Sequence, residues 1–304
     1  MLKNIISEAL HNAKVVSFTK DIIKASYIRF FRGHKKEIEE MVDLAFQLLV
    51  ENQNKKKSIS GLTKTASLIG RTIFHVHDPT FWFGMMEQNY SQHVRVLNDF
   101  SAIEPFIIGK RVLDFGSNGG YFALELSRGG YDVSMTDVLD SRVPDVRHLP
   151  FHKMSSPTDI PYRANSFDTV VIKTVLHHIN VENMPQVLKK IRNISSRLII
   201  EEDVFDVSSV VEKIKVKKRQ FKIAKFANLT PQEQYYYLVL NDYFTNAVIH
   251  ERPGINFPFT FHSIQEWKSI LSDSGYKIIK YIYNGFPGWK LTKNSQAWII
   301  CDRK

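Results

Sequence analysis

Residues 111–126, with the sequence RVLDFGSNGGYFALEL, decide the fold of this chain. The stretch begins with the apolar pair Val112-Leu113, passes an acidic residue at Asp114, and then reaches a turn rich in glycine. Glycine adopts backbone angles that other residues avoid, so this turn can be tight before a helix begins at Tyr121. In open α/β sheets the ligand lies beyond the carboxyl ends of the strands. The order of strand, glycine turn and helix therefore predicts the first half of a nucleotide-binding site.

The spacing of the glycines argues against a dinucleotide site, which requires G-x-G-x-x-G. Counting from Gly116, the second position is Asn118 and the third is Tyr121, so a dehydrogenase is not predicted. Asparagine tolerates left-handed backbone angles better than most residues do, and the turn can therefore form at Asn118. The pattern that fits is D-x-G-x-(G/N)-x-G, which places four residues in register: Asp114, Gly116, Asn118 and Gly120.

Two further motifs follow along the chain. Residues 131–135, YDVSM, are typical of a second strand, and Asp137 follows near the spacing of ribose-binding acids in nucleotide folds. A carboxylate there can accept hydrogen bonds from both ribose hydroxyls; the alternative is a solvated loop aspartate, with Asp140 as a rival. The third motif is SFDTVVI at 166–172, which is followed directly by KTVLHHI at 173–179.

On these residues the chain resembles the class I S-adenosylmethionine-dependent methyltransferases, and within them the type 11-like methyltransferases. Those sequences carry an acidic residue before a glycine loop, and often an SFD, apolar run and LHH pattern. The resemblance implies an α/β fold, a Rossmann-like doubly wound sheet with a reversed last strand, and S-adenosyl-L-methionine as cofactor. Residues 154–161 would form the adenine-contacting loop, where Ser156 replaces a frequent acid. The implied cofactor-binding residues are Asp114, Gly116, Asn118, Gly120, Asp137 and Ser156.

The chain divides into two predicted domains. Residues 1–104 carry apolar side chains at helical spacing, for example between Ile38 and Leu49, and contain none of the cofactor motifs. We expect them to form a helical cap region over the mouth of the site. Residues 105–304 form the methyltransferase domain, which an aromatic-rich insertion interrupts at about 204–262. We expect a helical lid over an apolar or aromatic acceptor there, with ordinary packing between helices as the alternative.

The pattern of strands and helices in the second domain is predicted from alternating apolar runs. Acidic residues 201–203 should follow the fifth strand at the rim of the sheet. The expected strands are 111–115, 132–136, about 146–153, 169–174, 197–200, 277–283 and 296–301, and the expected helices are 181–193 and 263–274, the latter with Ser263 as its N-cap.

Composition limits the remaining possibilities. The 304 residues carry a formal net charge of +10, which favours acidic partners such as RNA or an anionic membrane surface in contact with the N-terminal helices. Solvated lysines on helix faces are the simpler interpretation. The only cysteine, Cys301, lies in an apolar run, so we expect it to be buried in a reducing compartment. No apolar run is long enough to span a membrane and no signal-peptide core is present, so we expect a cytoplasmic location.

Methyl transfer asks for modest chemistry, because a sulfonium is already a good leaving group and the protein mainly aligns the acceptor and excludes water. A hydroxyl or amine acceptor also needs a base. His178 is the preferred base, since it matches the second histidine of the LHH pattern, with His177 and Glu201 as further catalytic candidates; the alternative is that the histidine only fixes the loop. No H-x-x-x-H or comparable spacing occurs, so no metal is predicted.

Three functions stay open from the sequence. The first is a methyltransferase that acts on a small or lipophilic acceptor by in-line displacement. The second is a methyltransferase for RNA or another macromolecule, which would use the basic surface and bind with strong salt dependence. The third is a non-catalytic cofactor-binding module, which the intact cofactor motif disfavours.

Overall fold

The computed structural model describes residues 2–53, 55, 58–78, 81, 93–207, 221–251, 257–287 and 294–304. Contacts between residues divide the chain into two compact units. The first unit comprises Met1–Ser91, Phe205–Phe261 and Gly285–Ser295, and the second comprises Gln92–Val204, His262–Asn284 and Gln296–Lys304.

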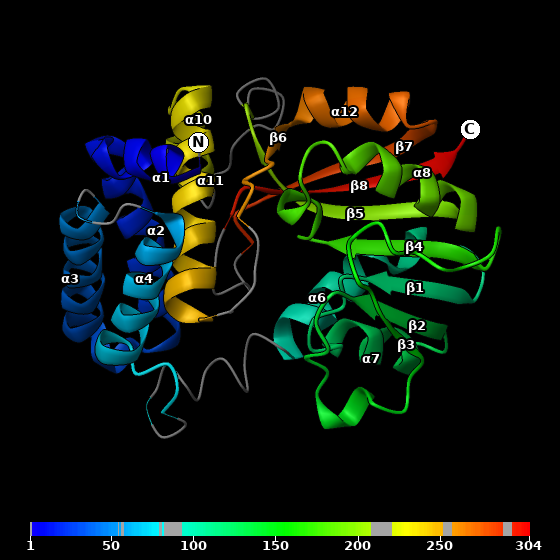
Figure 1. Cartoon of the computed structure of the whole chain (residues 1–304), viewed down its shortest axis with the longest axis horizontal. Coiled ribbons are helices and arrows are strands. Elements are labelled where there is room, and N and C mark those ends of the chain that lie inside the picture. Colours follow the sequence, from blue (N-terminus) through cyan, green and yellow to red (C-terminus); the bar gives the residue numbers. More distant parts are fainter. Residues whose placement is uncertain are drawn as a thin grey trace. The chain divides into compact units, whose positions relative to one another are not determined.

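An eight-stranded sheet forms the centre of the second unit (Figure 1). Its order is β3-β2-β1-β4-β5-β8-β7, and β6 pairs with β5. Strands β3, β2, β1, β4 and β5 are parallel, whereas β8 runs antiparallel to β5. This confirms the predicted Rossmann-like sheet with a reversed last strand. The strands are β1 Arg111–Phe115, β2 Asp132–Asp137, β3 Phe151–Lys153, β4 Phe167–Lys173, β5 Ser195–Phe205, β6 His262–Ser263, β7 Tyr276–Gly285 and β8 Gln296–Arg303.

Four α-helices accompany this sheet in the described part of the second unit: α6 His93–Ile103, α7 Tyr121–Arg128, α8 Met184–Ile194 and α12 Ile264–Asp273. Helices α6 and α7 bury apolar side chains in one core with residues of β1, β2, β4, β5 and β8. Helix α12 begins as predicted, because the Ser263 hydroxyl accepts the Glu266 N–H while the Glu266 carboxylate accepts the Ser263 N–H. Cys301 is buried in β8, and burial raises the pKa of its thiol to about 12.

The third and fifth strands differ most in length from the sequence prediction. The third begins only at Phe151, because Pro150 cannot donate to a strand ladder and the residues before it include the 3-10 turn Pro144–Val146. The fifth continues to Phe205, so the placement of Glu201 and its acidic neighbours beyond that strand was wrong. These residues are buried inside β5, where β8 pairs with them in antiparallel register.

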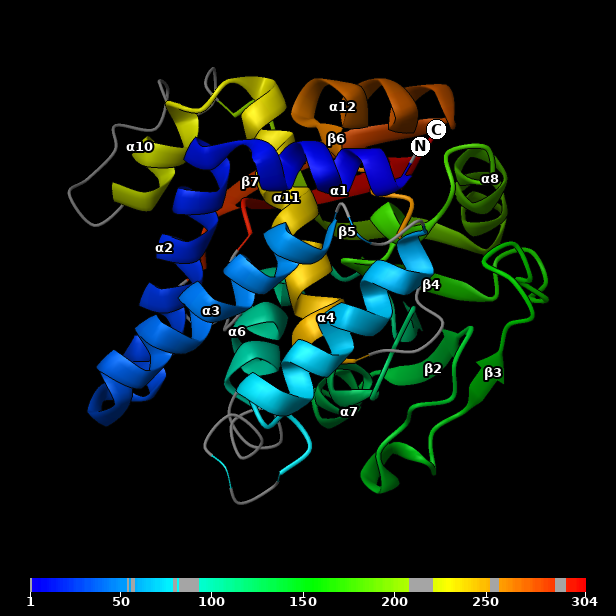
Figure 2. The same cartoon turned by 60° about the vertical axis from the view of Figure 1, so that its left-hand side comes forward.

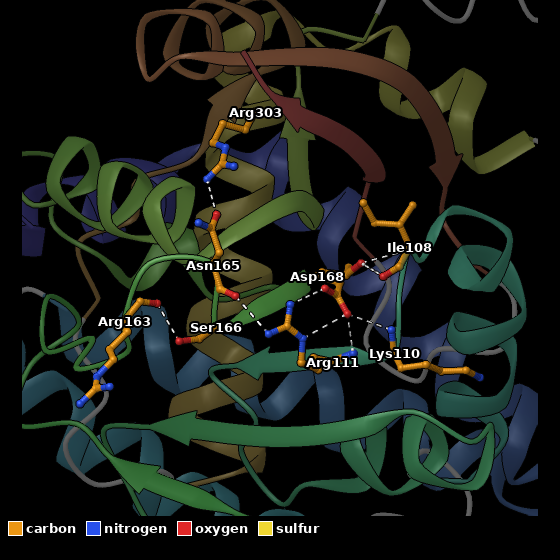
Figure 3. Close-up of polar contacts among 9 residues, drawn as sticks. Ile108, Lys110, Arg111, Arg163, Asn165, Ser166, Asp168 and Arg303 are labelled. Carbon is orange, nitrogen blue, oxygen red and sulfur yellow. Dashed lines mark hydrogen bonds and ion pairs between the residues drawn. The ribbon is translucent and has the colours of Figure 1, made fainter.

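A polar clamp joins the amino ends of β1 and β4 (Figure 3). The Asp168 carboxylate accepts the backbone N–H groups of Lys110 and Arg111, both at 3.0 Å, and the Arg111 guanidinium donates to it at 2.7 Å. Gly109 precedes this pair with a φ of +64°, and a Cβ there would lie 2.3 Å from the carboxyl carbon of Asp168. Only glycine therefore fits beside the clamped carboxylate.

The same clamp includes two hydrogen bonds between Thr169 and Ile108, and one hydrogen bond from Arg303 of β8. The Thr169 hydroxyl donates to the Ile108 carbonyl at 2.9 Å and accepts the Ile108 N–H at 3.0 Å. The backbone carbonyl of Asn165 accepts a hydrogen bond from the Arg111 guanidinium, and its side-chain oxygen accepts one from the Arg303 guanidinium (Figure 3). These contacts show that the SFD motif holds the entry of β1 against β4.

The first unit is helical (Figure 2). Helix α11 packs against α1 and α2, while α4 packs against the π-helical segment Phe244–Ile249 that continues α11. The described part of the insertion thus packs with the N-terminal helices. The helices are α1 Leu2–His11, α2 Ala13–Phe30, α3 Lys35–Gln53, α4 Ile59–Ile73, α10 Phe221–Ala227 and α11 Pro231–Tyr243.

Aromatic side chains fill much of the core of this unit. The ring of Phe18 in α2 lies 5.0 Å from Tyr237 and 6.0 Å from Phe226, and all three side chains are buried. Packing between helices, which was the alternative interpretation of the aromatic insertion, therefore accounts for these rings. The lysine-rich part of the insertion, residues 208–220, lies outside the described residues. No helix in the described ranges is both long and apolar enough to cross a membrane.

Candidate cofactor site and catalytic edge

The parallel register brings the predicted cofactor residues to one edge of the sheet. Phe115, the last residue of β1, pairs with Thr136 of β2 and with Ile172 of β4. The glycine turn after β1, Asp137 at the end of β2 and the turn after β4 are therefore neighbours. This is the carboxyl edge, where ligands of doubly wound sheets bind.

The turn after β1 depends on its glycines. Gly116 and Gly120 have φ angles of +76° and +80°, in the left-handed region. A Cβ on Gly116 would lie 2.4 Å from Val175, and one on Gly120 would lie 2.6 Å from Val146. Asn118 adopts a φ of +49°, the left-handed angle that asparagine was expected to tolerate. Glycine at these two positions therefore lets the turn pack closely against Val175 and Val146.

Asp137 connects the second strand to this cradle. Its carboxylate accepts the Asn118 N–H at 2.8 Å and the Leu139 N–H at 3.0 Å. The rival Asp140 is instead bound by its neighbour Arg142, with donor to acceptor distances of 2.9 and 3.0 Å. That hydrogen-bonded guanidinium lowers the pKa of Asp140 to about 2. The geometry favours Asp137 as the acid that belongs to the cradle.

Asp114 is buried directly before the cradle, with only 3% of its surface exposed. Its Oδ2 has no hydrogen-bond partner among the described residues. Burial raises the pKa of this carboxyl to about 7, against the lowering effect of the Lys173 charge and with a further rise from Asp137. Lys173 also forms an ion pair with Asp99 of α6, at 2.6 Å. Asp114 thus combines a raised pKa with a buried oxygen that accepts no hydrogen bond from the described residues.

Ser156 lies on the next loop along this edge, after β3. Its hydroxyl shares a hydrogen bond of 3.0 Å with the Thr158 hydroxyl. The acid of this loop is Asp159, whose carboxylate accepts the backbone N–H and the hydroxyl of Ser155, at 2.8 and 2.9 Å. Asp159 therefore stabilises the loop itself, and Ser156 stays the residue at the position that resembles an adenine contact.

The turn after β4 contains the predicted catalytic histidines. Thr174 adopts a φ of +53°, a strained angle for a β-branched residue, and donates its N–H to the Glu201 carbonyl at 2.7 Å. His177 is buried and His178 is half-buried, and their ring centroids are 4.2 Å apart. Glu201 is fully buried in β5 beside this turn. The structure therefore brings the three predicted catalytic residues to the same edge.

Sequence reasoning gave no separate role to two residues of this edge. Glu202 binds His177 Nδ1 at 2.6 Å, and Lys173 pairs with Asp99 while its charge acts to lower the pKa of Asp114. In the sequence, Lys173 is simply the lysine that follows the apolar run of β4. Glu202 is the middle one of three consecutive acidic residues that follow the apolar run at the start of β5. Both roles depend on contacts between distant parts of the chain.

This combination of a doubly wound sheet, a reversed last strand and a glycine cradle defines a cofactor-binding domain of the methyltransferase class. A family model described as "Methyltransferase domain" matches residues 85–281. The chain belongs to this family and is an S-adenosylmethionine-dependent methyltransferase, as the resemblance implied.

A comparison with solved structures finds similar proteins of low sequence identity. Magnesium protoporphyrin IX methyltransferase from Synechocystis PCC 6803, with bound SAH, is 15% identical, with 70% of this chain and 83% of that chain covered and a TM-score of 0.42. A SAM-dependent methyltransferase from Archaeoglobus fulgidus is 14% identical, with 73% and 100% covered and a TM-score of 0.47. No match to a curated protein was found.

Proposed function

We propose that this methyltransferase transfers a methyl group to a small or lipophilic acceptor by in-line displacement. The observation that carries the cofactor part of this proposal is the buried Oδ2 of Asp114, which no hydrogen-bond donor in the described structure satisfies and which directly precedes the glycine cradle. An unsatisfied buried polar atom costs about 1–3 kcal/mol, so such an atom marks a place for a ligand donor.

The residues of the carboxyl edge match the parts of the cofactor. Asp114 would accept from the positively charged amino group, and Asp137 would accept from the ribose hydroxyls. The backbone of the turn from Gly116 to Gly120 would approach the methionine and adenosyl parts of the cofactor. Ser156 would contact the adenine through its hydroxyl. These assignments follow the resemblance and agree with the charge and hydrogen-bonding capacity of each group.

S-adenosylmethionine supplies a methyl group on a sulfonium, which leaves readily. The chain has to orient the acceptor and exclude water. For a hydroxyl or amine acceptor it must also remove a proton, and the half-buried His178 or the buried His177 would be the base. Glu201 would assist from β5.

Calorimetric titration of the purified protein tests the proposal. S-adenosylmethionine and S-adenosylhomocysteine should bind, whereas NAD should not, because the cradle lacks the dinucleotide glycine spacing. Methyl transfer from labelled S-adenosylmethionine is then screened against apolar phenols and amines, and against RNA. Absence of binding to both sulfur compounds would contradict the cofactor assignment, and transfer to RNA alone would contradict the small acceptor.

A further inference from the structure

Glu202 is a buried carboxylate at the catalytic edge, and both of its oxygens accept hydrogen bonds. One oxygen accepts the N–H groups of Val175 and Leu176, at 2.9 and 2.7 Å. The other lies 2.6 Å from His177 Nδ1 and 3.3 Å from the Asp203 backbone nitrogen, which donates to it. Glu202 is completely buried. Four nitrogen partners around one carboxylate fit its ionised form, which only accepts hydrogen bonds.

This arrangement determines which nitrogen of His177 carries the hydrogen. A carboxylate at Nδ1 requires a donor there, so Nδ1 is protonated. In the neutral imidazole the lone pair then lies on Nε2, which is the basic atom. A carboxylate that orients an imidazole through Nδ1 is the arrangement that lets a histidine act as a base through its other nitrogen.

The same turn is coupled to the cofactor cradle. Val175 donates its N–H to Glu202. Its side chain lies 2.4 Å from the position that a Cβ on Gly116 would occupy. The strained Thr174 precedes it, and strain of this kind persists only where surrounding contacts hold the backbone. Glu202 supplies two of those contacts directly after Thr174, so it fixes the turn against the cradle.

We propose that Glu202 is a positioning residue that holds His177 in the Nδ1-protonated tautomer, so that His177 Nε2 is the basic atom of the histidine pair in methyl transfer. The assignment rests on the proposed function and gives the base role to His177 in place of His178. It explains why a charged side chain is fully buried in β5, where a hydrophobic residue would otherwise be expected.

The Glu202→Gln substitution separates this role from a structural one. Glutamine has nearly the same shape, and its carbonyl oxygen still accepts the N–H groups of Val175 and Leu176. Its amide NH₂ would then face His177 Nδ1 and donate to it, which moves the hydrogen to Nε2 and removes the base. The matched control is Asp203→Asn, which neutralises the next buried carboxylate, an acceptor for Gln296 at 2.8 Å.

Long-range proton–nitrogen NMR of the protein, labelled with ¹⁵N-histidine, reports the tautomer directly, and the signal lost in His177→Asn gives the assignment. We expect the Nδ1–H tautomer in the wild type and in Asp203→Asn, and the Nε2–H tautomer in Glu202→Gln. An Nε2–H tautomer in the wild type, or one that Glu202→Gln leaves unchanged, would overturn the inference. The wild-type spectrum decides even if the variant fails to fold.

Titration of the same samples with S-adenosylhomocysteine distinguishes the two levels of the argument. Affinity within about twofold of the wild type in Glu202→Gln, together with the changed tautomer, supports a positioning role. If the wild type binds no S-adenosylhomocysteine, the proposed function fails whatever the tautomer is. If it binds well but His177 has the wrong tautomer, only the role of Glu202 and His177 fails.

Discussion

Asp168 and Asp114 stand at opposite ends of the adjacent strands β4 and β1, and their surroundings are opposite as well. The Asp168 carboxylate accepts hydrogen bonds from the Arg111 guanidinium and from two backbone N–H groups. These hydrogen bonds, the one from the guanidinium first, lower the pKa of Asp168 to about 2 (Figure 3). Asp114 is buried with an unsatisfied oxygen, and its pKa rises to about 7. The same residue type therefore differs by about five pKa units across one pair of strands.

The difference separates stability from function. At the amino end, the carboxylate of Asp168 is fully used within the protein, so this end contributes to folding. At the carboxyl end, Asp114 is buried without a donor for one oxygen, and Thr174 holds a strained angle. Violations of local rules concentrate at functional sites, because a ligand rather than the fold compensates them. Substitutions at the two ends should therefore separate binding from stability.

The largest effect is expected from Gly116→Ala. The new methyl group would lie 2.4 Å from Val175, at a φ of +76° that alanine adopts only at a cost of about 1–2 kcal/mol. We expect the affinity for S-adenosylhomocysteine to fall at least about 100-fold, or about 2.7 kcal/mol, by calorimetry.

Gly109→Ala is the matched substitution at the other end, where a Cβ would lie 2.3 Å from the Asp168 carboxyl carbon at a φ of +64°. We expect it to lower the free energy of unfolding by about 2 kcal/mol while affinity stays within about twofold. Equal losses of affinity in both variants would show that the two ends are not functionally distinct.

Asp114→Asn should weaken binding and strengthen the fold. Because the folded pKa is raised, the wild type loses stability as the pH rises from about 4 through about 7, and asparagine removes this loss. The full shift corresponds to about 4 kcal/mol, and relaxation should leave about 1–2 kcal/mol of gain at pH 8. Affinity for S-adenosylhomocysteine should fall about 10- to 30-fold, since the charge is lost. Urea unfolding and calorimetry at pH 8 measure both; a variant less stable than the wild type would contradict the assignment.

Asp168→Asn should show the reverse pattern. The folded pKa is lowered, so the carboxylate contributes stability above pH 4 that disappears as the pH falls through about 2. Arg111 is about half exposed, which screens the pair, and we expect a loss of only about 1–2 kcal/mol at pH 7. Urea unfolding at pH 7 and pH 3 tests this, since the variant should approach the wild type at the lower pH. Cofactor affinity should not change, and a tenfold loss would refute the separation.

Much of the sheet and the cradle could be predicted, because their signals are local. The glycine turn, the left-handed Asn118 and the capping pair Ser263 and Glu266 each depend on residues within a few positions of one another. Their physics is therefore visible in a short window of sequence.

The parts that could not be predicted depend on distant contacts. Glu202 and its partner His177 are 25 residues apart, and three consecutive acids are usually solvated. These acids lie in β5, which is inside the sheet between β4 and β8, and β8 comes about 95 residues further along the chain. The packing of α11 with α1 and α2 likewise joins segments more than 200 residues apart, which no periodicity reveals.

A smaller effect should distinguish Asp137 from Asp140. Asp137→Ala removes an acceptor that binds the Asn118 N–H in the cradle and, in the proposal, the ribose, so affinity for S-adenosylhomocysteine should fall about fivefold without unfolding. Asp140→Ala is the matched control and should change affinity less than twofold, because its carboxylate binds Arg142 instead. Calorimetry at pH 8 compares them. If Asp140→Ala has the larger effect, the ribose assignment passes to Asp140.

The smallest expected effect is the release of a fraction of a proton from Asp114 when S-adenosylhomocysteine binds. With a pKa of about 7, Asp114 is about half protonated in the free protein at pH 7, and a positively charged amino group beside it favours the ionised form. Binding of S-adenosylhomocysteine should therefore release about half a proton at pH 7 and little at pH 8. Calorimetry in two buffers of different ionisation enthalpy measures this release. Asp114→Asn should abolish it, whereas Asp168→Asn, whose carboxylate is already ionised at both pH values, should leave it unchanged. Release that persists in Asp114→Asn would assign the proton to another group, and the contrast between the two aspartates would then be one of structure alone.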